Sequence, residues 1–188
     1  MADTSIESEL KIPVTDLDQV RAFLQRAQAI EVQKMAREIN LLLDTDDGRL
    51  RNAGSLLRLR RHGNRNLLTL KGPVSYRGAI KMREEHETEL SDLPRMIEIF
   101  ERLGFSVFMR YEKDREEWLM EEFSVVLDHT PMGDFVEVEG PPEQLERAAR
   151  LLGFDAAAAV RGSYVSLWLE YRELHPELDL PTDMVFAE

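Results

Sequence analysis

The chain has 188 residues, of which 43% are hydrophobic and 32% charged, and its formal net charge at pH 7 is −12. This composition predicts one soluble globular domain over residues 1–188, with a core at about 6–172 and an acidic extension at 173–188. The negative charge argues against partners such as nucleic acid or anionic membranes. Cysteine is absent, which excludes disulfides and thiolate metal sites and agrees with a cytoplasmic location. We expect no secretory signal at the start of the sequence. We also expect no membrane span, because no apolar run approaches the roughly 20 residues that cross a bilayer.

The first part of the chain is predicted to contain strands and one helix. A strand at residues 6–12 comes first, because charged side chains there alternate with apolar ones. Apolar residues at helical spacing then predict a helix with Thr15 or Asp16 as its N-cap. Three short strands follow at residues 41–44, 56–61 and 66–71, and the last two form a hairpin through a turn at 62–65.

The second part supplies the remaining strands and helices. A long strand at residues 79–90 leads into a helix that runs from Ser91 or Asp92 to a stop at Gly104. Two more helices are predicted, at residues 141–153 and from Ser163 onward. Between them lie strands at 111–120, 123–128 and 135–139. Short turns join most of the strands, so a mostly antiparallel sheet of about eight strands with about four helices is expected.

Charged side chains recur on one face of nearly every predicted strand. Arg58 and Arg60 share a face opposite leucines, and Glu137 and Glu139 share one opposite valines. An open sheet would show this face to water, whereas a closed barrel would enclose it as a polar tunnel under a layer of helices. Buried charges are costly unless they pair or bind a ligand, and a tunnel that holds a polyanion and a cation satisfies both signs. The pattern therefore favours an α+β fold with an eight-stranded antiparallel β-barrel and a charged interior.

Glu7-x-Glu9-x-Lys11 resembles the ExExK signature of the CYTH superfamily, the triphosphate tunnel metalloenzymes. That family includes class IV adenylyl cyclases, thiamine triphosphatases and inorganic triphosphatases. The resemblance covers residues 6 to about 172. Further pieces are similar to the family's motifs and occur in the same order: Asp44-Thr45, Leu56-Leu57-Arg58-Leu59-Arg60, Thr69-Leu70-Lys71-Gly72, Arg83-x-Glu85-x-Glu87, Lys113-x-Arg115, Leu127-Asp128, Gly133-Asp134-Phe135-Val136-Glu137-Val138-Glu139-Gly140 and Arg161-Gly162-Ser163-Tyr164.

The resemblance implies a tunnel that binds a triphosphate together with Mg²⁺ or Mn²⁺, hard cations that prefer oxygen ligands. Glu85 and Glu87 are expected either to bind a second metal or water or to orient the arginines, and Lys81 and Glu89 are expected at the rim. The implied metal ligands are Glu7, Glu9, Asp128, Glu137 and Glu139. The implied triphosphate-binding residues are Lys11, Arg58, Arg60, Lys71, Arg83, Lys113, Arg115 and Arg161. The expected catalytic residues are Glu9, Lys113 and Glu85.

The function expected from these residues is metal-dependent hydrolysis of a triphosphate. One alternative is a class IV adenylyl cyclase, and another is a non-catalytic module that binds triphosphate or polyphosphate. Asp3-Thr4-Ser5 stands where cyclase-like members often carry His-Phe, and Leu42-Leu43 where many members carry an aromatic pair. No tyrosine is an evident counterpart of the one that some inorganic triphosphatases use with a lysine to activate water, and His62 and His175 are expected to be exposed and inert. The expected partner is a small-molecule triphosphate, bound by a monomer or a homodimer.

Overall fold

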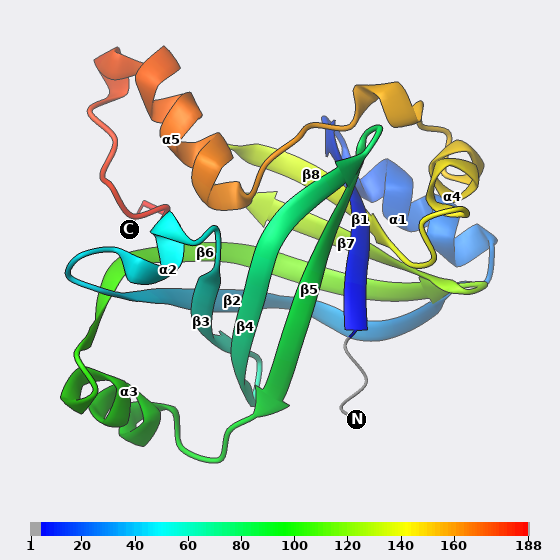
Figure 1. The fold of residues 1–188 in the computed structure, drawn as a ribbon. Helices are drawn as coiled ribbons and strands as arrows, with labels where there is room; N and C mark the ends of the chain where they lie inside the picture. The colour runs from blue at the N-terminus through cyan, green and yellow to red at the C-terminus, as the bar shows by residue number, and fades with distance from the viewer. Residues whose placement is uncertain (1–4, 188) are drawn as a thin grey trace.

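The computed structural model describes residues 5–187, so Asp3 and Thr4 lie outside the described part of the chain. Its eight strands form a closed antiparallel barrel in the order β1-β5-β4-β3-β2-β6-β7-β8 (Figure 1). This confirms the predicted fold. The strands are β1 (Ser5–Val14), β2 (Ile30–Thr45), β3 (Leu56–His62), β4 (Arg65–Arg77), β5 (Ile80–Glu89), β6 (Phe105–Met120), β7 (Phe123–Thr130) and β8 (Gly133–Glu139).

Strand β2 is much longer than the four residues predicted for it. Its first part, residues 30–37, pairs with β6 and has register irregularities between Glu31 and Gln33 and between Gln33 and Ala36. Apolar side chains there face water, since Ile30 and Val32 are 63% and 61% exposed. Without regular alternation of buried and exposed residues, this stretch gives no clear strand signal in the sequence. Pairing along the long strand β6 holds it in extended conformation.

Five α-helices flank the barrel in the described chain: α1 (Leu17–Arg26), α2 (Arg49–Asn52), α3 (Leu93–Arg102), α4 (Leu145–Leu151) and α5 (Tyr164–Leu174). Asp16, Asp92 and Ser163 cap α1, α3 and α5 by accepting hydrogen bonds from backbone amides, as expected. The single turn of α2 was not predicted. It forms around the buried Asp44 carboxylate, which accepts hydrogen bonds from the backbone amides of Leu50 (2.9 Å) and Arg51 (3.1 Å).

The hydrophobic core lies between the barrel and its helices. Leu24 of α1 and Leu145 of α4 pack with strand residues such as Leu10 and Val138, and α3 packs over Leu59 of β3. Because these apolar residues occupy the outer face of the strands, the alternate residues point into the barrel. The interior is therefore available for charged side chains. No helix in the described part of the chain is long and apolar enough to cross a membrane.

A segment at residues 180–187, which we call the C-terminal strap, packs on the barrel beside α5 (Figure 1). Met184 is fully buried and forms a parallel bridge with Tyr111 of β6. Its carbonyl accepts a hydrogen bond from the Glu112 amide (2.7 Å), and the Trp168 indole of α5 donates to the Thr182 carbonyl (3.1 Å). The strap therefore fastens α5 to the barrel.

Candidate functional site: a charged tunnel

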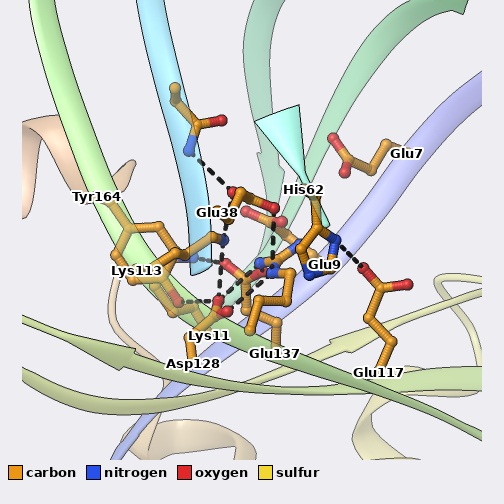
Figure 2. A network of polar contacts seen from close by, with 12 residues as sticks. Glu7, Glu9, Lys11, Glu38, His62, Lys113, Glu117, Asp128, Glu137 and Tyr164 are labelled. Carbon is orange, nitrogen blue, oxygen red and sulfur yellow. Dashed lines mark hydrogen bonds and ion pairs between the residues drawn. The ribbon is translucent and has the colours of Figure 1, made fainter. Parts of the chain in front are cut away.

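The barrel encloses a cavity of about 240 Å³ whose wall is built from the inward-facing residues of the strands. Alternation along β1 turns Glu7, Glu9 and Lys11 inward, and alternation along β3 does the same for Arg58 and Arg60. Figure 2 shows that carboxylates and ammonium groups from several strands meet in the interior. Buried charges of both signs therefore share one cavity, as the sequence pattern suggested.

Three carboxylates gather at one place on the cavity wall. One oxygen from each of Glu7, Glu9 and Glu139 lies within 4.8 Å of the other two. Residues Glu9 and Glu139 are direct neighbours across the β1–β8 pairing that closes the barrel. Burial, together with the negative charges of Glu7 and Glu9, raises the pKa of Glu139 to about 7.

The members of this carboxylate cluster differ in their partners. Lys71 donates to Glu7 (2.6 Å) and Lys81 donates to Glu9 (2.7 Å). Lys81, which we expected at the rim, is one of the residues that line the cavity. Burial opposes ionisation of Glu9, but Lys11 and Lys81 hold its pKa at about 2. Within residues 5–187, Glu139 has no hydrogen-bond or salt-bridge partner.

The donor set of the cluster fits a hard divalent cation. It consists only of carboxylate oxygens, the ligands that Mg²⁺ and Mn²⁺ prefer. Burial first, and then the charges of Glu7 and Glu9, raise the pKa of the Glu139 carboxyl despite the opposing effect of Arg115 and Lys71. A cation bound there would remove the repulsion between Glu139, Glu7 and Glu9.

The other two implied metal ligands, Asp128 and Glu137, lie among cations. Asp128 is fully buried and accepts hydrogen bonds from Arg115, Lys113 (3.1 Å) and the Tyr164 hydroxyl (2.6 Å). Glu137 forms ion pairs with Lys11 and Arg115. Although burial opposes it, Arg115 and Lys113 hold the pKa of Asp128 well below its usual range. The structure thus brings together Glu7, Glu9 and Glu139, and places Asp128 and Glu137 in a separate ion-pair network.

Glu38 of β2 is a central part of the tunnel that the sequence reasoning missed. It is fully buried, and its carboxylate lies 3.3 Å from Arg60 and 3.5 Å from Lys113, while Asn40 donates to it at 3.0 Å. These cations, Arg60 first, hold the pKa of Glu38 far below its usual value against the opposing effect of burial. The alternation of Glu38, Asn40 and Leu42 could have placed Glu38 on the inner face of a strand. The predicted strand, however, began only at residue 41.

The remaining implied phosphate ligands divide into two groups. Arg58 is buried, and its guanidinium lies 3.2 Å from the Thr69 hydroxyl and 3.6 Å and 3.7 Å from Glu85 and Glu87. Lys71 also lies on the cavity wall, 2.7 Å from Glu85. Arg161 is different: it is exposed, is absent from the cavity wall, and donates to the Gly78 carbonyl (2.8 Å).

Arg83 reaches the cavity but is tied to the backbone of neighbouring strands and loops. Its guanidinium donates to the carbonyls of Gly72 and Gly54, the latter at 3.0 Å. Burial lowers the pKa of Arg83, while Glu7 and Glu85 counteract that effect. Arg83 therefore links β5 to the β3 and β4 side of the tunnel while facing the carboxylates.

Two tyrosines that the sequence did not identify also line the tunnel. Tyr111 accepts a long hydrogen bond from Arg58 (3.4 Å), and Tyr164 donates to Asp128. The Tyr164 ring has Lys11 and Lys113 at 3.8 Å and 4.6 Å from its centre, respectively. Burial and the Asp128 charge raise the pKa of Tyr164 well above its usual value, so its hydroxyl stays a hydrogen-bond donor at neutral pH. The signal was the Ser163-Tyr164 helix start, a motif that by itself gives the tyrosine no role.

Comparison with known proteins agrees with this geometry. A protein of Methanocaldococcus jannaschii, named for a proposed adenylate cyclase activity, is 29% identical over 135 residues, or 71% of this chain and 76% of that protein. A structure from Vibrio parahaemolyticus, also named for a proposed adenylate cyclase activity, matches with a TM-score of 0.79 and 22% identity over 89% of this chain and 99% of that one.

A third match is HpAC1 of Hippeastrum, named for a proposed adenylyl cyclase activity and described as having a dominant triphosphatase activity. It has a TM-score of 0.63 and 18% identity over 87% of this chain and 95% of that one. At such identities the two structures show the fold alone. The model of the CYTH domain, however, matches residues 5–164, which is most of the sequence. The chain therefore belongs to the CYTH domain family.

Proposed function

We propose that the protein is a divalent-metal-dependent triphosphatase, which releases phosphate from an inorganic or organic triphosphate bound in the tunnel. The observation that carries this proposal is the sharing of one cavity by a cationic wall and a carboxylate cluster with an unpartnered member, Glu139. A pure anion-binding module would gain nothing from three converging carboxylates. A triphosphate bound with a metal ion satisfies both groups of charges, because its phosphates face the cationic wall and the ion faces the carboxylate cluster.

The cationic residues bind and orient the substrate in this proposal. Arg58, Arg60 and Arg115 offer planar guanidinium groups that suit phosphate oxygens. Carboxylates hold them in place: Glu38 pairs with Arg60 and Asp128 with Arg115, while Glu85 and Glu87 lie beside Arg58. Because these ion pairs already exist, little side-chain freedom is lost on binding, and the oxygens of the substrate meet charges in fixed positions. The wider phosphate-binding set, including Lys11, Lys71, Arg83 and the more peripheral Arg161, remains part of the proposal.

Glu7, Glu9 and Glu139 would hold the metal ion, Mg²⁺ or Mn²⁺, whereas Asp128 and Glu137, also expected as ligands, are paired with cations of the protein. When bound, such an ion supplies Lewis-acid polarisation of the phosphate oxygens and offsets their charge. Lys113 faces the same cavity, and its pKa is lowered by burial and then by Arg115. Glu85 has its pKa raised by burial and by Glu7. These two residues, with Glu87, are assigned to the reacting end of the substrate.

An adenylyl cyclase is the second candidate, because the M. jannaschii relative is named for that proposed activity. The cyclase reaction needs the same cradle but directs the ribose 3′-hydroxyl at the α-phosphorus. Support for hydrolysis comes from the Hippeastrum protein, in which the same fold is described with a dominant triphosphatase activity. The two reactions leave different products, so they can be separated directly.

The test is a substrate panel of inorganic triphosphate, ATP and thiamine triphosphate, each with Mg²⁺, with Mn²⁺ and with EDTA. We expect metal-dependent release of orthophosphate, faster from inorganic triphosphate than cyclic AMP forms from ATP. Cyclic AMP and pyrophosphate as the dominant products of ATP would establish the cyclase instead. Tight triphosphate binding without any turnover would leave the binding module.

A further inference from the structure

The two ends of the tunnel differ in charge because the strands are antiparallel. Strand β1 begins where β3, β5, β6 and β8 end, as the pairings of Ser5 with Glu85 and of Glu9 with Glu139 show. Inward-facing residues at this end, which we call the acidic end, are mostly carboxylates: Glu7, Glu85, Glu87, Glu117 and Glu139. The other end carries Lys11, and α5 and the strap pack there against Leu42, Tyr111 and Phe135. A triphosphate therefore meets the carboxylate cluster at the acidic end.

His62 is the one histidine of the described chain that lines this tunnel. It is 9% exposed and forms the last residue of β3, so the turn expected at residues 62–65 begins one residue later. The alternation that turns Arg58 and Arg60 inward continues to His62. Our expectation that His62 is exposed is therefore wrong, because the strand is longer than the sequence pattern indicated.

The two ring nitrogens of His62 have different surroundings. Nδ1 lies 3.7 Å from a Glu117 carboxylate oxygen, whereas Nε2 is buried without a hydrogen-bond partner (Figure 2). A buried polar atom without a partner costs on the order of 1–3 kcal/mol. In a side chain that lines a ligand cavity, such an atom is a position where a ligand or its attacking water supplies the missing partner.

We propose that Nε2 of His62 accepts the proton of the water that attacks the terminal phosphorus, and that Glu117 orients the ring. This rests on the proposed triphosphatase function. The water oxygen forms a bond to the terminal phosphorus and its proton passes to Nε2. The bond between that phosphorus and the bridging oxygen breaks, and the diphosphate leaves with the electron pair. The imidazolium then returns the proton to solvent.

The charges around His62 favour this role over phosphate binding. The groups that face it are Glu38, Glu117, Arg60 and Arg115, with Arg65 opposite on β4. Burial is the main cause that lowers the pKa of His62, so the ring is neutral near pH 7. A carboxylate beside Nδ1 favours the tautomer with its proton on Nδ1, which leaves a lone pair on Nε2. Phosphate oxygens have no proton to donate to that lone pair, whereas water does.

The first test compares His62→Gln with His86→Gln, a matched control on the outer face of β5 where His86 is half exposed. Phosphate release from inorganic triphosphate is measured at saturating Mg²⁺ from pH 5 to 9, with far-UV circular dichroism to verify folding. We expect His62→Gln to lower kcat by about 10²–10⁴-fold with little change in KM, which is the range for loss of a general base. It should also abolish the fall in kcat at acidic pH, while His86→Gln matches wild type.

The outcomes separate the two proposals. Wild-type protein that releases no phosphate from any triphosphate overturns both the function and the role of His62. Active wild type with an equally active His62→Gln variant overturns only the role of His62. That role is also overturned if His62→Gln loses kcat but keeps the acidic limb, because the limb would then belong to another group.

A second measurement needs neither metal nor substrate. The imidazole resonances of the metal-free protein are recorded by NMR against pH, with His62→Gln used to assign the His62 signals. We expect a neutral His62 ring with its proton on Nδ1 and a pKa below the ordinary value for histidine, because the ring is buried. A neutral ring with its proton on Nε2 would overturn the proposal, since Nε2 would then be a donor. The spectra are recorded at a temperature at which circular dichroism shows the variant to be folded, because unfolding would shift every imidazole signal and prevent the assignment.

Discussion

Arg115 and Asp128 form a two-pronged ion pair in the wall of the tunnel, with Nε 2.8 Å from Oδ1 and a terminal nitrogen 2.6 Å from Oδ2. The same carboxylate accepts from Lys113 and Tyr164. Oδ2 therefore accepts three hydrogen bonds and Oδ1 accepts one, so most of the accepting capacity of Asp128 is used by protein donors. In this structure Asp128 holds Arg115, Lys113 and Tyr164 in position.

Asp128→Asn should destabilise the protein by about 3 kcal/mol, because it leaves buried cations with too few partners. The matched control is Asp114→Asn, whose carboxylate pairs with the half-exposed Arg37 and should change stability by less than about 1 kcal/mol. Urea denaturation measures both. Isothermal titration with Mn²⁺ should show that folded Asp128→Asn still binds metal, and loss of metal binding alone would make Asp128 a direct ligand.

Glu9→Gln should abolish turnover while the protein stays folded, because it removes one charged oxygen ligand with little change of shape. Turnover by the wild type should stop in EDTA and return with Mg²⁺ or Mn²⁺. Glu84→Gln is the control, since Glu84 lies on the outer face of β5 and pairs with His86. Wild-type rates in Glu9→Gln, or full turnover by the wild type without metal, would remove the metal site from the carboxylate cluster.

Arg58→Ala should mainly raise KM for inorganic triphosphate, with a smaller fall in kcat. A charge-assisted contact to phosphate contributes on the order of 1.5–3 kcal/mol, so kcat/KM should fall at least about tenfold. Arg61→Ala tests the specificity of this effect, because Arg61 is exposed on the outer face of the same strand. If the two variants lost the same amount of kcat/KM, a general effect of charge would explain the result better than a contact.

Glu139→Gln should stabilise the metal-free protein above neutral pH. The pKa of Glu139 rises from 4.5 in the unfolded chain to about 7 in the folded protein because of burial and of Glu7 and Glu9. A carboxyl with a raised folded pKa costs nothing at low pH and destabilises progressively as pH rises from about 4.5 to 7. The expected gain of the variant is on the order of 1–3 kcal/mol at pH 8 and vanishes near pH 4.5.

Thermal unfolding of both proteins in EDTA across this pH range provides the measurement. Addition of Mg²⁺ should stabilise the wild type at pH 8 more than Glu139→Gln, since only the wild type offers the third charged oxygen. A variant that is less stable than wild type at pH 8 in EDTA would show that the Glu139 charge is compensated by groups of the protein.

The alternation of charged and apolar residues made the barrel predictable. The charges recur on one face of nearly every strand, and a tunnel that binds a polyanion and a cation accounts for charges of both signs on that face. Arg58, Arg60, Lys71 and Lys113 were placed on the inner face from this pattern alone. The pattern could not show which charges pair across the tunnel, since that depends on register between strands far apart in sequence. The separation of Asp128 from the carboxylate cluster is an example.

Residues near strand ends and irregularities were the ones missed. Glu38 precedes residue 41, where the predicted strand began, and His62 follows residue 61, where another predicted strand ended, so the alternation was not extended to either residue. Tyr164 was missed for another reason. It comes from a helix that packs against the barrel, and no periodicity within a helix tells which of its residues enters a cavity made by other elements.

The closure of the barrel between its first and last strands has a consequence for folding kinetics. Glu9 lies opposite Glu139, and Lys11 opposite Glu137, so these pairs are brought together across nearly the whole length of the barrel sequence. Contacts between such distant residues form late, since the entropy of closing the intervening chain must be overcome first. The carboxylate cluster therefore comes into existence only with the final pairing of β1 and β8. Refolding should be slow for a chain of this size, and the ability to bind a divalent cation should appear in its last phase.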